Sequence, residues 1–366
     1  MLALVLGIGN AVGAYHGGVV AAMEAAAVEP YWLAGSSIGA VMAALVAGNP
    51  HGQRTVAMRE FWRRGTQLDG PASWVPKGWR KAIHMTAALQ ARTMGRPALY
   101  QPRLSQLIPA RTSFDPLVPA AKGRLSRVST RSRLVRTGIT GLTLNPGMYD
   151  AAPMRCTIED LVDFDLLNSG AVRVSVMTVD LESGLEHPFD TVRDRLTADH
   201  ILASAALIPD FPAVEINGRA YVDGGLAANV PVDLVLQEPP SAPLACFSAD
   251  PFPRAGPRPR RLGDAAERQT DLIFASQTER TLRAMQQIWD LRDADAPGAV
   301  YRLTYASQPD ETAMKGFDFS QSSIERRWQQ GETDMGTALR LWRDRPPFGR
   351  GLQVHDATAS QVLADA

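Results

Sequence analysis

The stretch Tyr31-Trp-Leu-Ala-Gly-Ser-Ser-Ile-Gly-Ala40 most constrains what this chain can fold into. Its apolar run predicts a buried strand, and the small residues that follow predict a sharp turn leading directly into a helix. Gly35 and Gly39 stand two residues before and after Ser37, and this G-x-S-x-G spacing leaves room around a serine in a strained turn. We therefore expect Ser37 to be a nucleophile and Ile38 to offer its N–H at the helix start. A plain strand-to-helix turn is the alternative interpretation of this pattern alone.

A second strand, glycine loop and helix begin at the N-terminus. Leu2–Leu6 is a short apolar run, and Gly7-Ile-Gly-Asn-Ala-Val-Gly13 separates it from a helical pattern. Backbone N–H groups in such a loop can hold a pyrophosphate or a transition-state oxyanion. The glycine spacing departs from the dinucleotide fingerprint, and no acidic residue clearly ends a second strand about 20 residues further on. With Ser37 in the next unit, the pattern favours the oxyanion interpretation.

The composition is that of a globular chain without an overall charge bias. Its 366 residues are 45% hydrophobic, enough for one large α/β domain or two smaller ones. The 38 basic residues balance the 38 acidic ones, so net charge argues for neither nucleic acid nor membrane. Cys156 and Cys246 cannot form a disulfide framework, and no Cys/His cluster predicts zinc. We expect a reducing compartment, no cofactor and no metal.

Neither the N-terminus nor any later run predicts membrane insertion. The first residues are apolar but lack a basic leader, so they read as a strand and not as a signal peptide. No uninterrupted apolar run approaches the roughly 18 residues that span a bilayer. We expect a cytoplasmic protein whose only membrane association is peripheral.

The region between the second unit and residue 153 is helical at first and then irregular. A helical, amphipathic pattern from residue 53 to 92 contains Phe61, Trp62, Trp74 and Trp79, which we expect in the core and not in a ligand cage. Prolines break any long element in the following insertion, about residues 103–150. Its central part has six cations and no acid, namely Lys122, Arg124, Arg127, Arg131, Arg133 and Arg136. This segment is either a solvated mobile loop or a flap that meets anionic lipid headgroups.

A β-hairpin is predicted over residues 211–225. Asn217-Gly218 stands between two alternating apolar runs, the strongest short-range hairpin signal. The second run ends on Asp223, followed by Gly224 and Gly225. An aspartate in this position forms either an Asx turn or the acidic member of a site.

Three stretches together resemble the patatin-like phospholipase family. They are the first glycine loop, the G-S-S-I-G turn, and Ala203-Ser-Ala-Ala-Leu-Ile-Pro209 followed by Tyr221-Val-Asp-Gly-Gly-Leu226 and Asn229-Val-Pro-Val232. The resemblance spans residues 1–236. In addition, Lys315-Gly-Phe-Asp-Phe-Ser320 with Arg327-Trp328 is similar to a C-terminal extension in one bacterial branch of that family.

The resemblance implies a three-layer α/β/α fold with a mainly parallel sheet, and a serine acyl hydrolase acting on lipid esters. It implies a single domain over residues 1–345, with a C-terminal extension at about 250–345 and a flexible tail at 346–366. The reaction would be of the phospholipase A or lysophospholipase type, proceeding through an acyl-enzyme, and nucleic acid is not an expected partner. Ser37 matches the nucleophile, Asp223 the base, and Gly9 and Asn10 the oxyanion donors. The residues that support these motifs are Gly7, Gly13, Gly35, Ile38, Gly39, Gly224 and Gly225.

The glycine loop departs from the family pattern. Ile8, Gly9 and Asn10 stand at the glycine triplet, and Val12 stands where the family has Lys or Arg. We expect a slow esterase whose rate rises when a cation is restored at Val12, provided that the side chain reaches the outer face of the loop. The alternatives are a non-catalytic lipid- or protein-binding relative and a dinucleotide-binding protein. No catalytic role is assigned to His16, His200 or His355.

Overall fold

The computed structural model describes residues 1–67, 77–103, 145–238, 242–292, 297–308, 310–347 and 349–358. The basic segment at 122–136, most of the insertion around it, and Trp74 lie outside the described residues. The main-sheet strands are β1 (Leu2–Leu6), β2 (Trp32–Ser36), β5 (Arg173–Asp180), β6 (Phe189–Asp190), β7 (Val214–Ile216), β8 (Arg219–Asp223), β9 (Leu244–Asp250), β10 (Gly298–Thr304) and β11 (Leu352–Asp356). A separate antiparallel pair consists of β3 (Gln101–Pro102) and β4 (Tyr149–Asp150).

The described residues contain ten α-helices. They are α1 (Ala14–Ala25), α2 (Ile38–Ala47), α3 (Arg54–Gly65), α4 (Lys77–Met94), α6 (Ala152–Leu161), α7 (Phe164–Leu167), α8 (Ala198–Ser204), α9 (Asp233–Leu236), α10 (Leu262–Leu291) and α11 (Gln321–Asp344). Three 3₁₀ turns accompany them, η1 (Asn10–Gly13), η3 (Gly224–Leu226) and η4 (Lys315–Phe317).

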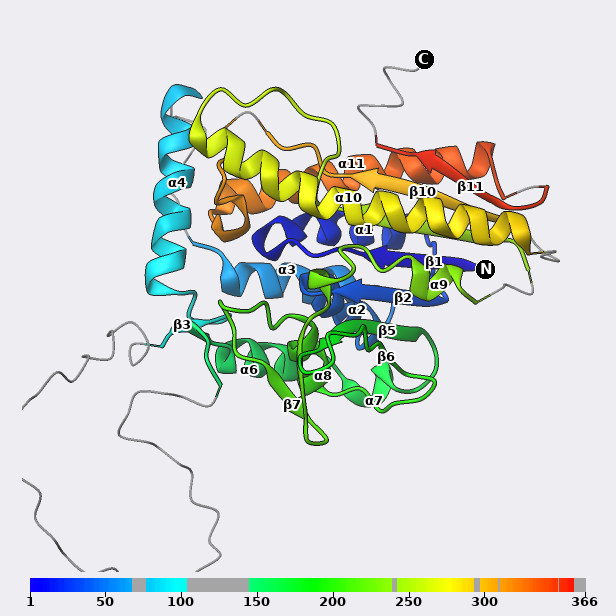
Figure 1. Cartoon of the computed structure of the whole chain (residues 1–366), viewed down its shortest axis with the longest axis horizontal. Helices are drawn as coiled ribbons and strands as arrows, with labels where there is room; N and C mark the ends of the chain where they lie inside the picture. Colours follow the sequence, from blue (N-terminus) through cyan, green and yellow to red (C-terminus); the bar gives the residue numbers. More distant parts are fainter. Residues whose placement is uncertain are drawn as a thin grey trace, which may run out of the picture.

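The central sheet is mainly parallel, which confirms the predicted fold class. Its strand order is β11-β10-β9-β1-β2-β5-β8-β7, and β6 pairs with β5 outside this path. Neighbouring strands from β11 to β5 run parallel, whereas β6, β7 and β8 are antiparallel to their partners. Because parallel neighbours need crossover connections, helices cover both faces of the sheet (Figure 1).

The alternation of side chains along β1 separates the two faces. Leu2, Leu4 and Leu6 belong to one buried cluster together with residues of α1, α2 and α11. Ala3 and Val5 point the other way, into a second cluster with residues of α9 and α10. Two apolar faces on one strand require two helical layers, so the protein is a three-layer α/β/α structure.

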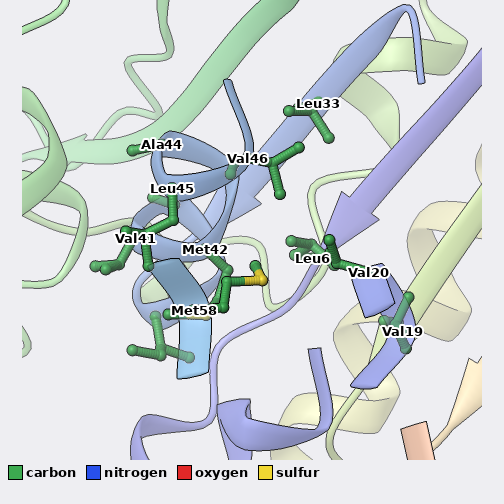
Figure 2. Packing of buried hydrophobic residues seen from close by; sticks show 14 of the residues in the cluster. Leu6, Val19, Val20, Leu33, Val41, Met42, Ala44, Leu45, Val46 and Met58 are labelled. Carbon is green, nitrogen blue, oxygen red and sulfur yellow. The ribbon is translucent and has the colours of Figure 1, made fainter. Parts of the chain in front are cut away.

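Helix α2 lies inside the larger cluster. All of its residues are buried, which agrees with the lack of charged residues between 38 and 47. Figure 2 shows its side chains between Leu33 of β2 and Met58 of α3. The helix that follows the candidate nucleophile is therefore held on several sides, and this rigidity positions its first residue.

The hairpin prediction is confirmed, whereas the predicted flexible tail at 346–366 is wrong at residues 352–356. β7 and β8 pair antiparallel around Asn217 and Gly218, which both have positive φ. Residues 352–356 form edge strand β11 instead of a flexible tail, because Leu352 packs into the cluster beneath β10.

The aromatic side chains of the 53–92 region divide between the core and the surface. Phe61 and Trp62 of α3 are buried, as predicted. Trp79 of α4 is 70% exposed, which contradicts the expectation that it packs in the core. Among the described residues, no helix combines the length and the apolarity needed to cross a bilayer.

The C-terminal helix α11 packs closely on α1. A Cβ atom added to Gly331 would lie 2.1 Å from the Tyr15 carbonyl oxygen, and one added to Gly18 would lie 1.9 Å from that of Trp328. The Tyr15 hydroxyl donates to Asp334 Oδ2 across the same interface at 2.9 Å. This contact joins the two ends of the chain in one core and supports our proposal of a single domain over residues 1–345.

We expect Gly331→Ala to lower the free energy of unfolding by about 1–3 kcal/mol, because the added methyl group has to push α1 away. Gly336→Ala is the matched control in the same helix, since its Cβ would meet only the flexible end of Arg340 at 3.9 Å. Higher helix propensity predicts a gain of up to about 1 kcal/mol there. Chemical denaturation measures both changes, and equal effects of the two substitutions would contradict the close approach of α11 to α1.

Candidate active site

Ser37 occupies a strained turn between β2 and α2. Its backbone has φ 56° and ψ −126°, a conformation that residues with a side chain rarely adopt. A Cβ on Gly39 would lie 2.1 Å from the Leu6 carbonyl oxygen, and one on Gly35 would lie 2.4 Å from the Gly39 carbonyl carbon. The two glycines are thus required by close backbone approach, and the turn has the geometry of a nucleophile elbow.

The two adjacent serines have different surroundings. Ser36 is fully buried, and its hydroxyl donates to the Ala228 carbonyl oxygen at 2.8 Å. Ser37 is only partly buried and lines a cavity. Only Ser37 is therefore accessible to a bound molecule.

Asp223 lies at the end of β8, beside Ser37. Its Oδ1 accepts a hydrogen bond from the Gly225 N–H at 2.7 Å. Burial raises the pKa of Asp223 to about 7, while hydrogen bonds from the Ser37 side chain and the Gly225 amide act in the opposite direction. A carboxylate with a pKa in this range is a better proton acceptor than an ordinary aspartate.

A short segment that begins with the last residue of α8 tethers both residues. The Ser37 N–H donates to the carbonyl oxygen and the hydroxyl of Ser204, at 3.1 and 3.0 Å. The Asp223 N–H donates to the Ala206 carbonyl oxygen at 3.1 Å. The Ala-Ser-Ala-Ala motif noted in the sequence therefore fixes the relative positions of the serine and the aspartate, a role that its local pattern does not indicate.

The glycine loop after β1 is held from behind. The Gly7 N–H donates to the Ala249 carbonyl at 3.0 Å, and the Ile8 N–H donates to the Asn229 carbonyl at 3.2 Å. Burial lowers the pKa of His16 to about 4, so its imidazole is neutral at pH 7 and donates from Nε2 to the Gly7 carbonyl at 2.8 Å. His16 is thus a buried residue that supports the loop.

Two amides of this loop remain for a ligand. Within the described part of the chain, the N–H groups of Gly9 and Asn10 have no hydrogen-bond acceptor, and both residues line the cavity beside Ser37. Since the Gly7 and Ile8 amides are already bonded, the loop offers fewer donors than a pyrophosphate-binding loop uses. This geometry suits a single oxyanion.

The cavity that joins these groups has a volume of about 230 Å³. Ser37, Asp223, Gly9 and Asn10 all line it. Most of its other lining side chains are apolar, namely Ile8, Val12, Ile38, Val41, Met154, Ala205, Leu207, Phe211, Phe252, Phe274, Ala313, Met314 and Phe317. No histidine is among the described lining residues, and such a surface fits a hydrocarbon chain.

The C-terminal part of the chain supplies one wall of the cavity, which sequence reasoning missed. Lys315, Gly316 and Phe317 of η4 line the cavity, and a Cβ on Gly316 would be only 3.8 Å from the Gly9 carbonyl oxygen. The Lys315 ammonium donates to Asp271 Oδ1 at 2.8 Å and to the Ser307 hydroxyl at 2.7 Å. The sequence around Lys315 predicts only a C-terminal extension, and no local pattern there indicates a position beside Ser37.

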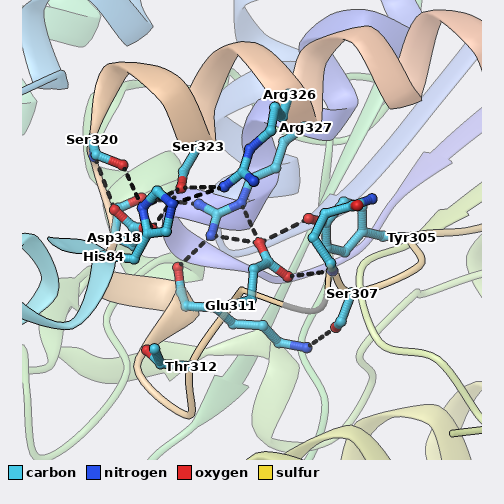
Figure 3. Close-up of polar contacts among 12 residues, drawn as sticks. His84, Tyr305, Ser307, Glu311, Thr312, Asp318, Ser320, Ser323, Arg326 and Arg327 are labelled. Atoms are coloured by element: carbon cyan, nitrogen blue, oxygen red, sulfur yellow. Dashed lines mark hydrogen bonds and ion pairs between the residues drawn. The ribbon is translucent and has the colours of Figure 1, made fainter. Parts of the chain in front are cut away.

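A buried polar network holds η4 in place (Figure 3). Arg327 of α11 donates to the carbonyl oxygens of Lys315 and Asp318, at 3.0 and 2.9 Å, and to Glu311 Oε1. Burial acts to raise the pKa of Asp318, but hydrogen bonding to His84 and the nearby Arg327 hold it at about 2. The turn that faces Gly9 is therefore anchored to α11 and, through His84, to α4.

The side chain of Val12 does not reach the outer face of the glycine loop, which was the condition for a rate gain from Lys or Arg at this position. Its side chain is 1% exposed and belongs to the main hydrophobic cluster, although part of it reaches the cavity wall. Lys or Arg at this position would place a charge in an apolar environment. The structure thus gives no support to a rate gain from such a substitution, and we expect it to destabilise the fold.

We expect Asp223→Asn to stabilise the protein at pH 8 and to have little effect near pH 4. The pKa of this carboxyl rises from 3.8 to about 7 on folding, so the native state binds more protons between these values. Its contribution to stability is then present at low pH and lost as pH rises toward 7. Denaturant unfolding between pH 4.5 and 8.5 measures this, with exposed Asp344→Asn as the control. A variant less stable than the parent at every pH would contradict the buried, poorly solvated carboxylate.

Comparisons with known proteins give two matches to family models. A family model described as "Patatin-like phospholipase" matches residues 4–236, and another described as "Patatin phospholipase" matches residues 275–347. Comparison with curated proteins gives no significant match. Among solved structures, the crystal structure of VipD from Legionella pneumophila is similar with a TM-score of 0.39 and 11% sequence identity. The alignment covers 92% of this chain and 66% of that chain.

Proposed function

This chain belongs to the patatin-like phospholipase family, which supports hydrolysis of lipid esters, and on that premise we propose a specific reaction. The protein is a phospholipase A or lysophospholipase that cleaves carboxylic esters through a dyad of Ser37 and Asp223. The observation that supports this most is the shared cavity, which is lined by both dyad members and by the unpaired amides of Gly9 and Asn10.

The first half of the reaction forms an acyl-enzyme. Asp223 takes the hydroxyl proton of Ser37 as Oγ attacks the ester carbonyl carbon, and the carbonyl oxygen becomes an oxyanion. The Gly9 and Asn10 amides stabilise this charge, and each such donor contributes on the order of 10²–10³ in rate. Protonated Asp223 then gives its proton to the departing alkoxide, and the acyl group stays on Ser37.

The second half releases the fatty acid. Asp223 takes a proton from a water molecule, whose oxygen attacks the acyl carbon. The second oxyanion occupies the same two amides, and its collapse breaks the bond to Oγ, which regains the proton from Asp223. The carboxylate base is regenerated, so the cycle consumes one water and one ester.

The buried position of Asp223 makes a two-residue mechanism chemically reasonable. An ordinary aspartate, with a pKa near 3.9, is a poor base for a hydroxyl. Burial raises the pKa of Asp223 to about 7, which brings the base closer to the working pH. The value of kcat/KM, which reports the ionisation of the free enzyme, should therefore rise with pH up to about 7 as the Asp223 carboxyl loses its proton.

Two further proposals concern location and membranes. We retain a cytoplasmic location with peripheral membrane contact, and contact of residues 122–136 with anionic headgroups, as proposals that rest on the sequence. The six cations of this segment, which has no acidic residue, support contact with anionic headgroups.

A non-catalytic binding relative remains the rival function, because Val12 stands where the family has a cation.

We expect Ser37→Ala to abolish ester hydrolysis and Ser36→Ala to retain most of it. The Ser36 hydroxyl donates a hydrogen bond to the Ala228 carbonyl oxygen at 2.8 Å, and Ser36 does not line the cavity. Turnover of a chromogenic ester by both purified variants measures the difference, with thermal unfolding to check that each is folded. Equal losses in two folded variants would refute the assignment of the nucleophile.

We expect Phe317→Ala to shift chain-length preference toward longer or bulkier acyl groups, by about tenfold in the ratio of kcat/KM values. Phe317 lines the cavity, so its removal extends the apolar space. Phe319→Ala is the matched control, because Phe319 is buried two residues away and does not line the cavity. A series of p-nitrophenyl esters gives the ratio. An unchanged preference in Phe317→Ala would mean that η4 is no wall of the acyl site.

A further inference from the structure

Helix α4 presents an apolar face to solvent. Positions 79, 82, 86, 89 and 93 share one side of the helix and carry Trp, Ala, Thr, Leu and Thr. Trp79 is 70% exposed and Leu89 is 53% exposed, while Met85 and Met94 beside them are 40% and 70% exposed. The inner side is formed by buried His84, Ala87, Ala88 and Ala91. The outer side of α4 thus exposes large apolar side chains between the polar Thr86, Gln90 and Thr93, with no acidic residue among them.

The charges on α4 are all positive. Its sequence contains Lys77, Arg80, Lys81 and Arg92 and no acidic residue. Lys81 forms an ion pair with Asp264 of α10 at 3.6 Å, and Arg92 lies at the other end of the helix. A helix with apolar and aromatic residues on one face and cations flanking it has the composition of a segment that lies in a membrane interface.

The same helix borders the cavity that contains Ser37. Arg92 lines this cavity, and its guanidinium lies over the Phe317 ring at 5.1 Å from the ring centre. In Figure 1, α4 stands at one end of the molecule, across the direction of the sheet strands. A surface that contacts α4 near Arg92 is thus next to the cavity that contains Ser37.

The chain that follows α4 contains further positive charge in its sequence. The antiparallel pair of β3 and β4 comes directly after this helix and encloses residues 104–144 in the sequence. These residues therefore leave and re-enter the described structure close to the C-terminal end of α4. Their sequence includes six cations between Lys122 and Arg136.

We propose that α4 is an interfacial helix that docks the protein on a lipid bilayer with anionic headgroups. The outer side chains Trp79, Met85 and Leu89 enter the boundary between headgroups and acyl chains, and the flanking cations pair with lipid phosphates. This inference rests on the proposed function, since it gives the site access to lipid esters from the bilayer. It differs from contact through residues 122–136 in using a folded, amphipathic element.

The test uses the full chain and vesicles of phosphatidylcholine with phosphatidylglycerol. Met85→Glu/Leu89→Glu places two negative charges on the outer face, and we expect vesicle binding to fall by about tenfold or more. Leu291→Glu is the matched control, since Leu291 is an 88% exposed leucine at the C-terminal end of α10. Binding by the parent should weaken with salt and disappear on vesicles of phosphatidylcholine alone, and Trp79 fluorescence should shift to shorter wavelength on binding.

Two activity measurements separate this inference from the proposed function. The double variant should hydrolyse a soluble short-chain ester at the parent rate and lose most of its activity on vesicle lipid. Parent-like vesicle binding by the double variant overturns the role of α4, and intact soluble-ester turnover would then leave the hydrolase proposal standing. If the parent lacks turnover on every ester, the proposed function fails, while vesicle binding still decides the role of α4.

Competing occupants give different results. Binding lost only on deletion of residues 122–136, and unchanged in the double variant, overturns the inference and assigns membrane contact to the insertion. A parent that dimerises in solution, with the double variant monomeric and vesicle binding unaffected, identifies the face as a contact between copies and also overturns it.

Discussion

The approach of α2 to the carboxyl end of β1 is the constraint on which the candidate site depends. A single methyl group on Gly39 would lie 2.1 Å from the Leu6 carbonyl oxygen. Because the two elements come so close, strained Ser37 lies beside the loop that follows β1, and the same edge of a parallel sheet collects both turns. The Ser204 hydroxyl and carbonyl oxygens then hold the Ser37 amide. The strain is retained because neighbouring elements leave the turn no alternative.

Burial of Asp223 links the fold to the proposed chemistry. The environment that raises its pKa to about 7 disfavours the charged form, and the same environment makes the carboxylate a stronger base. Residues far apart in the chain create this environment. Gly225 packs against Ile8 so closely that an added Cβ would lie 2.3 Å from that side chain, and η4 closes the cavity from the C-terminal region. Burial of the Asp223 carboxylate thus lowers the stability of the folded protein near neutral pH and makes this carboxylate a stronger base.

Local sequence patterns predicted the parts of this site that depend on local geometry. The spacing of Gly35, Ser37 and Gly39 identified the strained turn, and Asn217-Gly218 identified the hairpin that delivers Asp223. Contacts between distant segments escaped prediction. Nothing near Gly316 indicates that it lies close to the Gly9 carbonyl, and nothing near Val12 reveals its burial. β11 depends on pairing with β10 and on the packing of Leu352, which are both contacts with distant residues. Trp79 was expected in the core because an aromatic residue in an amphipathic pattern usually packs there, whereas its face of α4 meets no other element among the described residues.

Identification of a covalent adduct on Ser37 tests the central claim most directly. The full-length protein is treated with a fluorophosphonate whose alkyl chain fits an apolar cavity, digested, and analysed by peptide mass spectrometry. The account predicts one phosphonylated site, at Ser37, with labelling reduced by a competing long-chain ester and absent in Ser37→Ala. The account would be contradicted if Ser37 of the folded protein carried no adduct, or if another serine were modified while Ser37 was not. Either result would favour a non-catalytic binding protein.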